Sequence, residues 1–123
     1  MTLRALKAEA SGLGAHAARL CAELCHAADH RQNASVIILA AAVLDVALRE
    51  PTGPASTADG AAIAEARDSR EAYWLRERRN GIVHYEGGRG GFMGDADDDA
   101  ILAEDAARAI AALTEALAIL NYG

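Results

Sequence analysis

The sequence predicts an all-α fold, an antiparallel bundle of four to five helices that residues 1–123 form as a single domain. Apolar side chains recur every three to four residues through most of the chain, which is the spacing of one face of an α-helix. The sequence contains no alternating strand pattern and no internal repeat. A length of 123 residues is ordinary for one domain and buries enough surface to fold without disulfides or metals.

The first helix is expected over residues 3–27. Gly12 and Gly14 weaken it by about 1 kcal/mol each relative to alanine, but small residues also let another helix approach closely. We expect the apolar side of this helix to form a seam that packs nearly parallel to a partner helix. The residues on that side are Leu3, Leu6, Ala10, Leu13, Ala17, Leu20, Leu24 and Ala27.

The second helix is expected to be the central and most buried one, because residues 36–48 are apolar nearly all the way round. Asp29 and Gln32 resemble a capping box ahead of it, and the helix has to end before Pro51. Asp45 is the one carboxylate inside this apolar run. It therefore needs a cationic partner from another helix.

A turn with two prolines leads to Ser56 or Thr57, either of which is suited to cap a third helix over residues 61–85. The glycine-rich residues 87–94 break that helix, because five of these eight residues are glycines, which are costly to order. A final helix follows, with the carboxylates of residues 97–99 complementing its dipole. Its apolar stripe consists of Leu102, Ala106, Ala109, Leu113, Ala116, Leu117 and Leu120.

The net charge of −6 argues against a protein that coats nucleic acid through a broad basic surface. Residues 67–89 are the exception, since they carry more arginines than carboxylates. This distribution fits a local anion site. The arginines of this segment are Arg67, Arg70, Arg76, Arg78, Arg79 and Arg89.

Hydrophobic residues make up 52% of the chain without a run close to the roughly 20 apolar residues of a membrane span. Residues 1–4 lack the layout of a signal peptide, so a cytoplasmic protein with no membrane partner is expected. Cys21 and Cys25 are four residues apart on a helix, which rarely allows a disulfide. With His26 they do not form a paired-ligand pattern, and no metal and no cofactor are expected.

The strongest candidate site is Arg79-Asn80-Gly81-Ile82-Val83-His84, near the end of the third helix. Asn80 and His84 share a helix face, so the amide can hold one ring nitrogen of the imidazole and leave the other free. The guanidinium of Arg79 reaches the same space and offers a planar fork of donors suited to phosphate oxygens. A proton shuttle beside an anion clamp suggests phosphodiester chemistry.

This motif resembles the Arg-x4-6-His signature of the HEPN domain family (higher eukaryotes and prokaryotes nucleotide-binding). It shares with that signature the arginine, the polar residue after it, the spacing to the histidine and the setting in a small helical chain. The resemblance implies a HEPN-like bundle, usually a homodimer, that acts as a metal-independent endoribonuclease on RNA. It also implies a toxin–antitoxin toxin whose partner is a nucleotidyltransferase-type antitoxin. In that branch a tyrosine two residues after the histidine is modified; here Tyr85 follows His84 directly, and Glu86 occupies the second position.

The implied chemistry is attack of the RNA 2′-hydroxyl on the adjacent phosphate, with His84 as general acid or base, Arg79 stabilising the phosphoryl oxygens and Asn80 orienting the imidazole. Arg76 and Arg89 are candidates for binding substrate. Tyr85, like Tyr73 and Trp74, either stacks on bases or packs against the protein. The alternative function is a non-catalytic helical module that binds a nucleotide or a protein.

Asp45 is expected to face Arg79 within one subunit and to support the site. The alternative is that these two residues form only a buried ion pair that fixes helix register. For His84 the alternative is an imidazole that satisfies the last carbonyls of its helix.

Overall fold

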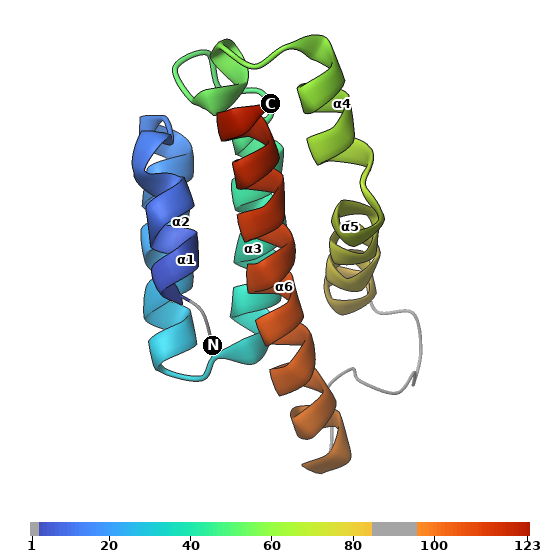
Figure 1. The fold of residues 1–123 in the computed structure, drawn as a ribbon. Helices are drawn as coiled ribbons and strands as arrows, with labels where there is room; N and C mark the ends of the chain where they lie inside the picture. Colours follow the sequence, from blue (N-terminus) through green and yellow to red (C-terminus); the bar gives the residue numbers. More distant parts are fainter. Residues whose placement is uncertain (1–2, 85–95) are drawn as a thin grey trace.

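The computed structural model describes residues 3–84 and 96–123, and every regular element in these ranges is helical (Figure 1). The all-α prediction is confirmed. None of the described helices is both long enough and apolar enough to cross a membrane. The elements are α1 (Leu3–Glu9), η1 (Ala10–Gly12), α2 (Ala15–Asp29), α3 (Asn33–Ala47), η2 (Pro54–Ser56), α4 (Gly60–Asp68), α5 (Arg70–Val83) and α6 (Ala96–Tyr122), where η marks a short 3-10 helix.

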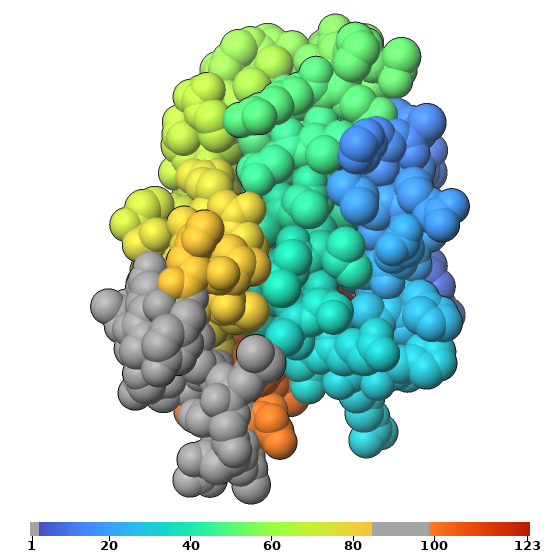
Figure 2. All heavy atoms as spheres, turned by 180° about the vertical axis from the view of Figure 1, so that it is seen from behind, coloured from blue at the N-terminus to red at the C-terminus, as the bar shows by residue number. Residues whose placement is uncertain are grey.

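The helices form a bundle with α3 and α6 at its centre, α1 and α2 on one side, and α4 and α5 on the other (Figure 1). α2 runs opposite to α3, as expected for helices joined by a short turn. α3 and α6 run in the same direction, however, so the bundle is not antiparallel throughout (Figure 1). Seen from behind, α3 reaches the surface between α5 and α2 (Figure 2).

The core lies mainly between α3 and α6, and the expected central position of α3 is confirmed. Val36, Ile37, Val43 and Leu44 of α3 are each 0% exposed. Burying a side chain of this size contributes about 1.5–3 kcal/mol. The apolar stripe predicted for the last helix is buried against them: Leu102, Ala106, Ala109, Leu113, Ala116, Leu117 and Leu120.

The first expected helix is two helices, and the prediction of a continuous helix over residues 3–27 is wrong. Leu13 and Gly14 are extended, with ψ of 146° and 168°. The carboxylate of Glu50, from the loop after α3, accepts hydrogen bonds from the backbone N–H groups of His16 at 2.9 Å and Ala17 at 3.2 Å. A distant carboxylate thus caps α2, and this stabilises the interruption.

The third expected helix is also interrupted, at Ser69, which ends α4 and whose hydroxyl accepts a hydrogen bond from the N–H of Ala72 at 3.1 Å at the start of α5. The predicted cap at Ser56 or Thr57 is wrong. Asp59 caps α4 instead, with its carboxylate accepting from the N–H of Ala62 at 2.8 Å. These two interruptions are why six α-helices, rather than four or five, occur in the described residues.

The predicted capping box between α2 and α3 is also wrong. Asp29 is the last residue of α2, and Gln32 makes no side-chain cap at the start of α3. The chain turns instead through Arg31, whose φ of 55° lies in the left-handed region. A non-glycine residue there costs about 1 kcal/mol, which the packing of α2 against α3 outweighs.

Candidate functional site

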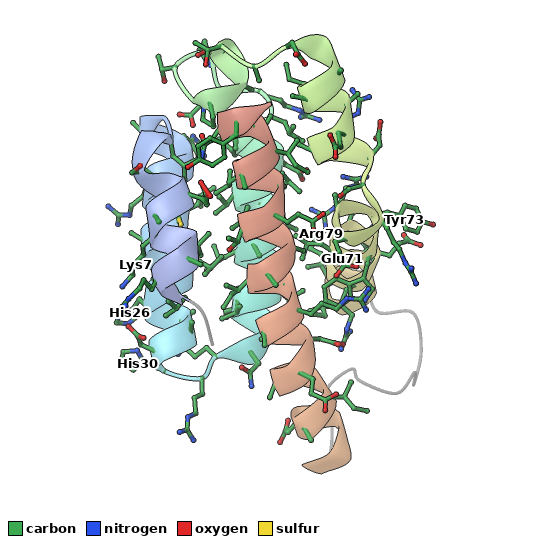
Figure 3. The ribbon with its side chains drawn as sticks, viewed as in Figure 1. Lys7, His26, His30, Glu71, Tyr73 and Arg79 are labelled. Carbon is green, nitrogen blue, oxygen red and sulfur yellow. The ribbon has the colours of Figure 1, made fainter. Side chains whose placement is uncertain are left out.

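Arg79 lies on the side of α5 that faces the bundle, whereas Tyr73 points away from it (Figure 3). The Nε of Arg79 donates a hydrogen bond to the side-chain oxygen of Asn80 at 2.9 Å. This bond fixes one edge of the guanidinium and leaves its two terminal nitrogens to meet other groups. Asn80 therefore positions the arginine.

The predicted pairing of Asp45 with Arg79 within one subunit is confirmed, because Nη1 of Arg79 is 3.6 Å from Oδ2 of Asp45. The expectation that this pair is buried is wrong: the two side chains are 26% and 36% exposed. A separation of 3.6 Å is too long for a hydrogen bond. The contact is a loose, solvent-accessible ion pair of about 0.2–1 kcal/mol, so Asp45 holds the guanidinium weakly.

His84 directly follows the last residue of α5, and its backbone N–H donates to the carbonyl of Asn80 at 2.9 Å. Its side chain is exposed. No hydrogen bond in residues 3–84 and 96–123 joins the imidazole of His84 to the amide of Asn80, whose oxygen is engaged by Arg79. The expectation that Asn80 holds the imidazole is therefore not met. The residue is exposed directly after the end of α5, four residues after Asn80 and five after Arg79.

Arg76, one turn before Arg79, lines a pocket where α3, α4 and α5 meet. Asp45 lines the same pocket and so connects it to Arg79. Two further arginines of the pocket, Arg49 and Arg67, were not singled out as site residues from the sequence. Arg49 had a sequence signal, since it lies four residues after Asp45, although the structure places it two residues beyond the end of α3.

Two contacts between α5 and α6 hold the site in place. Nε of Arg78 is 2.7 Å from Oδ2 of Asp105, and these side chains are only 10% and 22% exposed. Two turns nearer the start of α5, Glu71 accepts two hydrogen bonds from Arg108, at 3.0 and 2.8 Å. The bonds from Arg108 lower the pKa of the Glu71 carboxyl.

The aromatic residues beside the motif have different surroundings. The guanidinium carbon of Arg108 lies 4.0 Å from the ring centre of Trp74, so Trp74 packs between α5 and α6. Tyr73 is 61% exposed and donates a hydrogen bond to Glu77 at 3.3 Å. Two predicted site residues, Tyr85 and Arg89, lie outside the described residues.

Within the described ranges, no three histidine, cysteine or carboxylate side chains are grouped in a way that could hold a metal ion. The donors present are instead guanidinium groups, an amide and an imidazole, which suit an oxyanion and proton transfer. The sequence matches no family model, no curated protein and no solved structure. The functional argument therefore depends on the residues of this chain.

Proposed function

We propose that this chain is a metal-independent endoribonuclease of HEPN type. The observation that carries the proposal is the arrangement of Arg79, Asn80 and His84 at the end of α5. The guanidinium is braced by Asn80 at 2.9 Å and only loosely paired with Asp45 at 3.6 Å. The imidazole of His84, the residue that directly follows α5, is exposed. In this proposal the anion clamp and the proton-transfer group act on one phosphodiester.

In the proposed reaction, the RNA 2′-oxygen bonds to the adjacent phosphorus while the bond from phosphorus to the 5′-oxygen breaks. The products are a 2′,3′-cyclic phosphate and a 5′-hydroxyl. The proton of the 2′-hydroxyl passes to a base, and a proton passes to the departing 5′-oxygen. His84 acts as base or acid. Arg79 stabilises the charge that grows on the non-bridging oxygens, and Asn80 fixes the orientation of Arg79.

A homodimer supplies the second proton-transfer group. One imidazole cannot be base and acid at the same moment, whereas two copies of His84 across one cleft provide both. The resemblance of residues 79–84 to the HEPN signature supports this assembly, and it also supports the role of a toxin paired with a nucleotidyltransferase-type antitoxin. Size-exclusion chromatography with light scattering tests the dimer. Growth arrest on expression, relieved by His84→Ala, tests the toxin role.

The second candidate is a helical module that binds a nucleotide or a protein without cleaving RNA. It is favoured by the contact between Arg79 and Asp45, because a guanidinium paired with a carboxylate stabilises the bundle without any substrate. Under this alternative, Arg79→Ala lowers stability but affects no reaction.

The deciding experiment incubates purified protein with end-labelled RNA in the presence of a chelator. We expect cleavage by the native chain and a loss of about 10²–10⁴-fold in His84→Ala and about 10²–10³-fold in Arg79→Ala. His16→Ala is the matched control, because His16 is an exposed histidine on α2. Absence of cleavage by the native chain, or equal cleavage by all variants, would falsify the nuclease proposal. Unfolding curves for each variant separate lost chemistry from lost structure.

A further inference from the structure

The pocket between α3, α4 and α5 has a volume of about 460 Å³. Leu48 and Ile63 form its apolar part, and its charged lining consists of Asp45, Arg49, Arg67, Asp68 and Arg76. This volume is within the roughly 300–1,000 Å³ typical of small-molecule sites. It is large enough for a nucleotide and is not limited to a single ion.

The charges of the pocket are not evenly satisfied. Arg67 and Asp68 neutralise each other, because Nε and Nη2 of Arg67 donate to both carboxylate oxygens at 2.8–3.1 Å. Asp45 is the other carboxylate of the described lining, which also includes Arg49 and Arg76, and it is paired with Arg79 outside the pocket. Three guanidinium groups for one carboxylate leave an excess of positive charge in a chain whose net charge is −6.

The other two arginines of the pocket, Arg76 and Arg49, are held differently. Nη1 of Arg76 donates to the backbone carbonyl of Arg67 at 2.7 Å, which fixes the guanidinium, and the charge of Arg76 helps to lower the pKa of the Asp68 carboxyl that Arg67 already binds. Arg49 is exposed, and its side chain makes no hydrogen bond or ion pair within the described part of the chain. Arg76 is thus a fixed cation and Arg49 an adaptable one. Both line the same pocket, and both retain N–H donors for oxyanion binding.

Asp45 links this pocket to the proposed catalytic residues. It lines the pocket and is 3.6 Å from Arg79, while Arg76 precedes Arg79 on α5 by one turn, about 5 Å along the helix axis. The arginines therefore continue from the end of α5 towards α4. A carboxylate held only by a loose ion pair is readily displaced by a phosphate, which carries more oxygens and more charge.

From this arrangement we infer that the pocket is a second phosphate subsite, which binds a phosphate group next to the one that is cleaved in a single-stranded RNA. Arg49 and Arg76 contact its oxygens, Arg67 completes the wall, and Asp45 lies between the two phosphate positions. The inference rests on the proposed function for the identity of the ligand, but binding can be measured without cleavage.

The test is a titration of a labelled short single-stranded RNA with the non-cleaving His84→Ala protein at several salt concentrations. Arg49→Gln and Arg76→Gln, each added to this background, are expected to weaken binding about tenfold and to reduce the slope of log K against log salt by about 0.7. Asp45→Asn is expected to tighten binding. Arg4→Gln is the matched control, because Arg4 is an exposed arginine on α1 with no ion pair among the described residues.

If Arg49→Gln and Arg76→Gln bind RNA as Arg4→Gln does, the subsite is refuted, whether or not the native chain cleaves RNA. A parallel titration with adenosine monophosphate and inorganic phosphate separates the two sources of a phosphate group. Arginine-dependent binding of these small molecules, with RNA binding unaffected, overturns the assignment to RNA. Loss of RNA binding in both pocket variants supports the subsite even if the native chain proves unable to cleave.

Discussion

The side-chain oxygen of Asn80 accepts a hydrogen bond from Nε of Arg79 at 2.9 Å, so neighbouring residues of one helix brace each other. From the sequence, the amide was expected to hold His84 instead. The observed bond assigns Asn80 a different task, which is to fix the guanidinium edge that faces away from Asp45. An Asn80 that positions Arg79 and an Asn80 that positions His84 have different consequences for activity, and these can be measured.

Asn80→Ala is expected to lower kcat for RNA cleavage about tenfold, because a mobile guanidinium stabilises the transition state less well. The pH of maximal kcat should not move, since the imidazole of His84 keeps its surroundings. In an Arg79→Ala background the same change should have no further effect. Additive losses, or a displaced pH optimum, would show that Asn80 acts on His84 after all.

The ion pair between Arg78 and Asp105 is expected to stabilise the fold more than the pair between Arg108 and Glu71. The first pair is 10% and 22% exposed, and the second is 42% and 29% exposed. Asp105→Ala should lower the free energy of unfolding by about 2 kcal/mol, and Glu71→Ala by less than about 1 kcal/mol. Urea unfolding of both variants measures the difference, and equal losses would contradict it.

Gly14 and Gly12 offer a matched pair for testing the cap that Glu50 provides. A Cβ at Gly14 would lie 2.5 Å from the carboxylate carbon of Glu50, whereas a Cβ at Gly12 meets nothing within 4 Å. Gly14→Ala should therefore displace the cap and cost about 1–2 kcal/mol of stability. Gly12→Ala should be neutral or stabilising by up to about 1 kcal/mol.

The double variant Gly14→Ala/Glu50→Ala provides the control for this explanation. Once the carboxylate is absent, the methyl group has nothing to displace, so the two losses should not add. Thermal unfolding monitored by circular dichroism is sufficient for the comparison. If Gly14→Ala costs as much without Glu50 as with it, the explanation by steric displacement is wrong.

The pH dependence of stability should contain a contribution from Glu71. Its pKa is lowered chiefly by the hydrogen bonds from Arg108, so this carboxyl stabilises the folded state above its unfolded pKa of about 4.3. The stabilisation is lost as the pH falls through the lower, folded value. Glu71→Gln should therefore flatten the acid limb of a plot of Tm against pH. An unchanged acid limb would show that the pair contributes nothing.

Cys21 is expected to resist thiol reagents while the chain is folded. Burial raises its pKa to about 11, so at pH 8 only about one molecule in a thousand carries the thiolate. In Cys25→Ser, the remaining thiol should react with a chromogenic disulfide reagent at the rate of unfolding. Reaction much faster than unfolding would contradict this burial. The matched Cys21→Ser protein reports the rate of Cys25.

The sequence alone correctly predicted the helical character of the chain, the buried position of α3 and the pairing of Asp45 with Arg79. Each of these predictions follows either from the spacing of residues along the chain or from the need to bury apolar groups and to pair charged ones. Apolar residues on all sides can only be buried, and a carboxylate inside an apolar run needs a cation. The nuclease function and the dimer remain predictions for the experiments above.

Only the tertiary structure decided where the helices are interrupted and which arginines share a pocket. Glu50 caps α2 from more than thirty residues away in the chain, and no local pattern around Gly14 reveals a partner so distant in sequence. Likewise, Arg67 and Arg76 belong to α4 and α5, and Arg49 follows the end of α3. Helical periodicity indicates which face of a helix is buried, but it does not specify which other helix that face meets. The packing of the helices against one another therefore determined both the cap and the pocket.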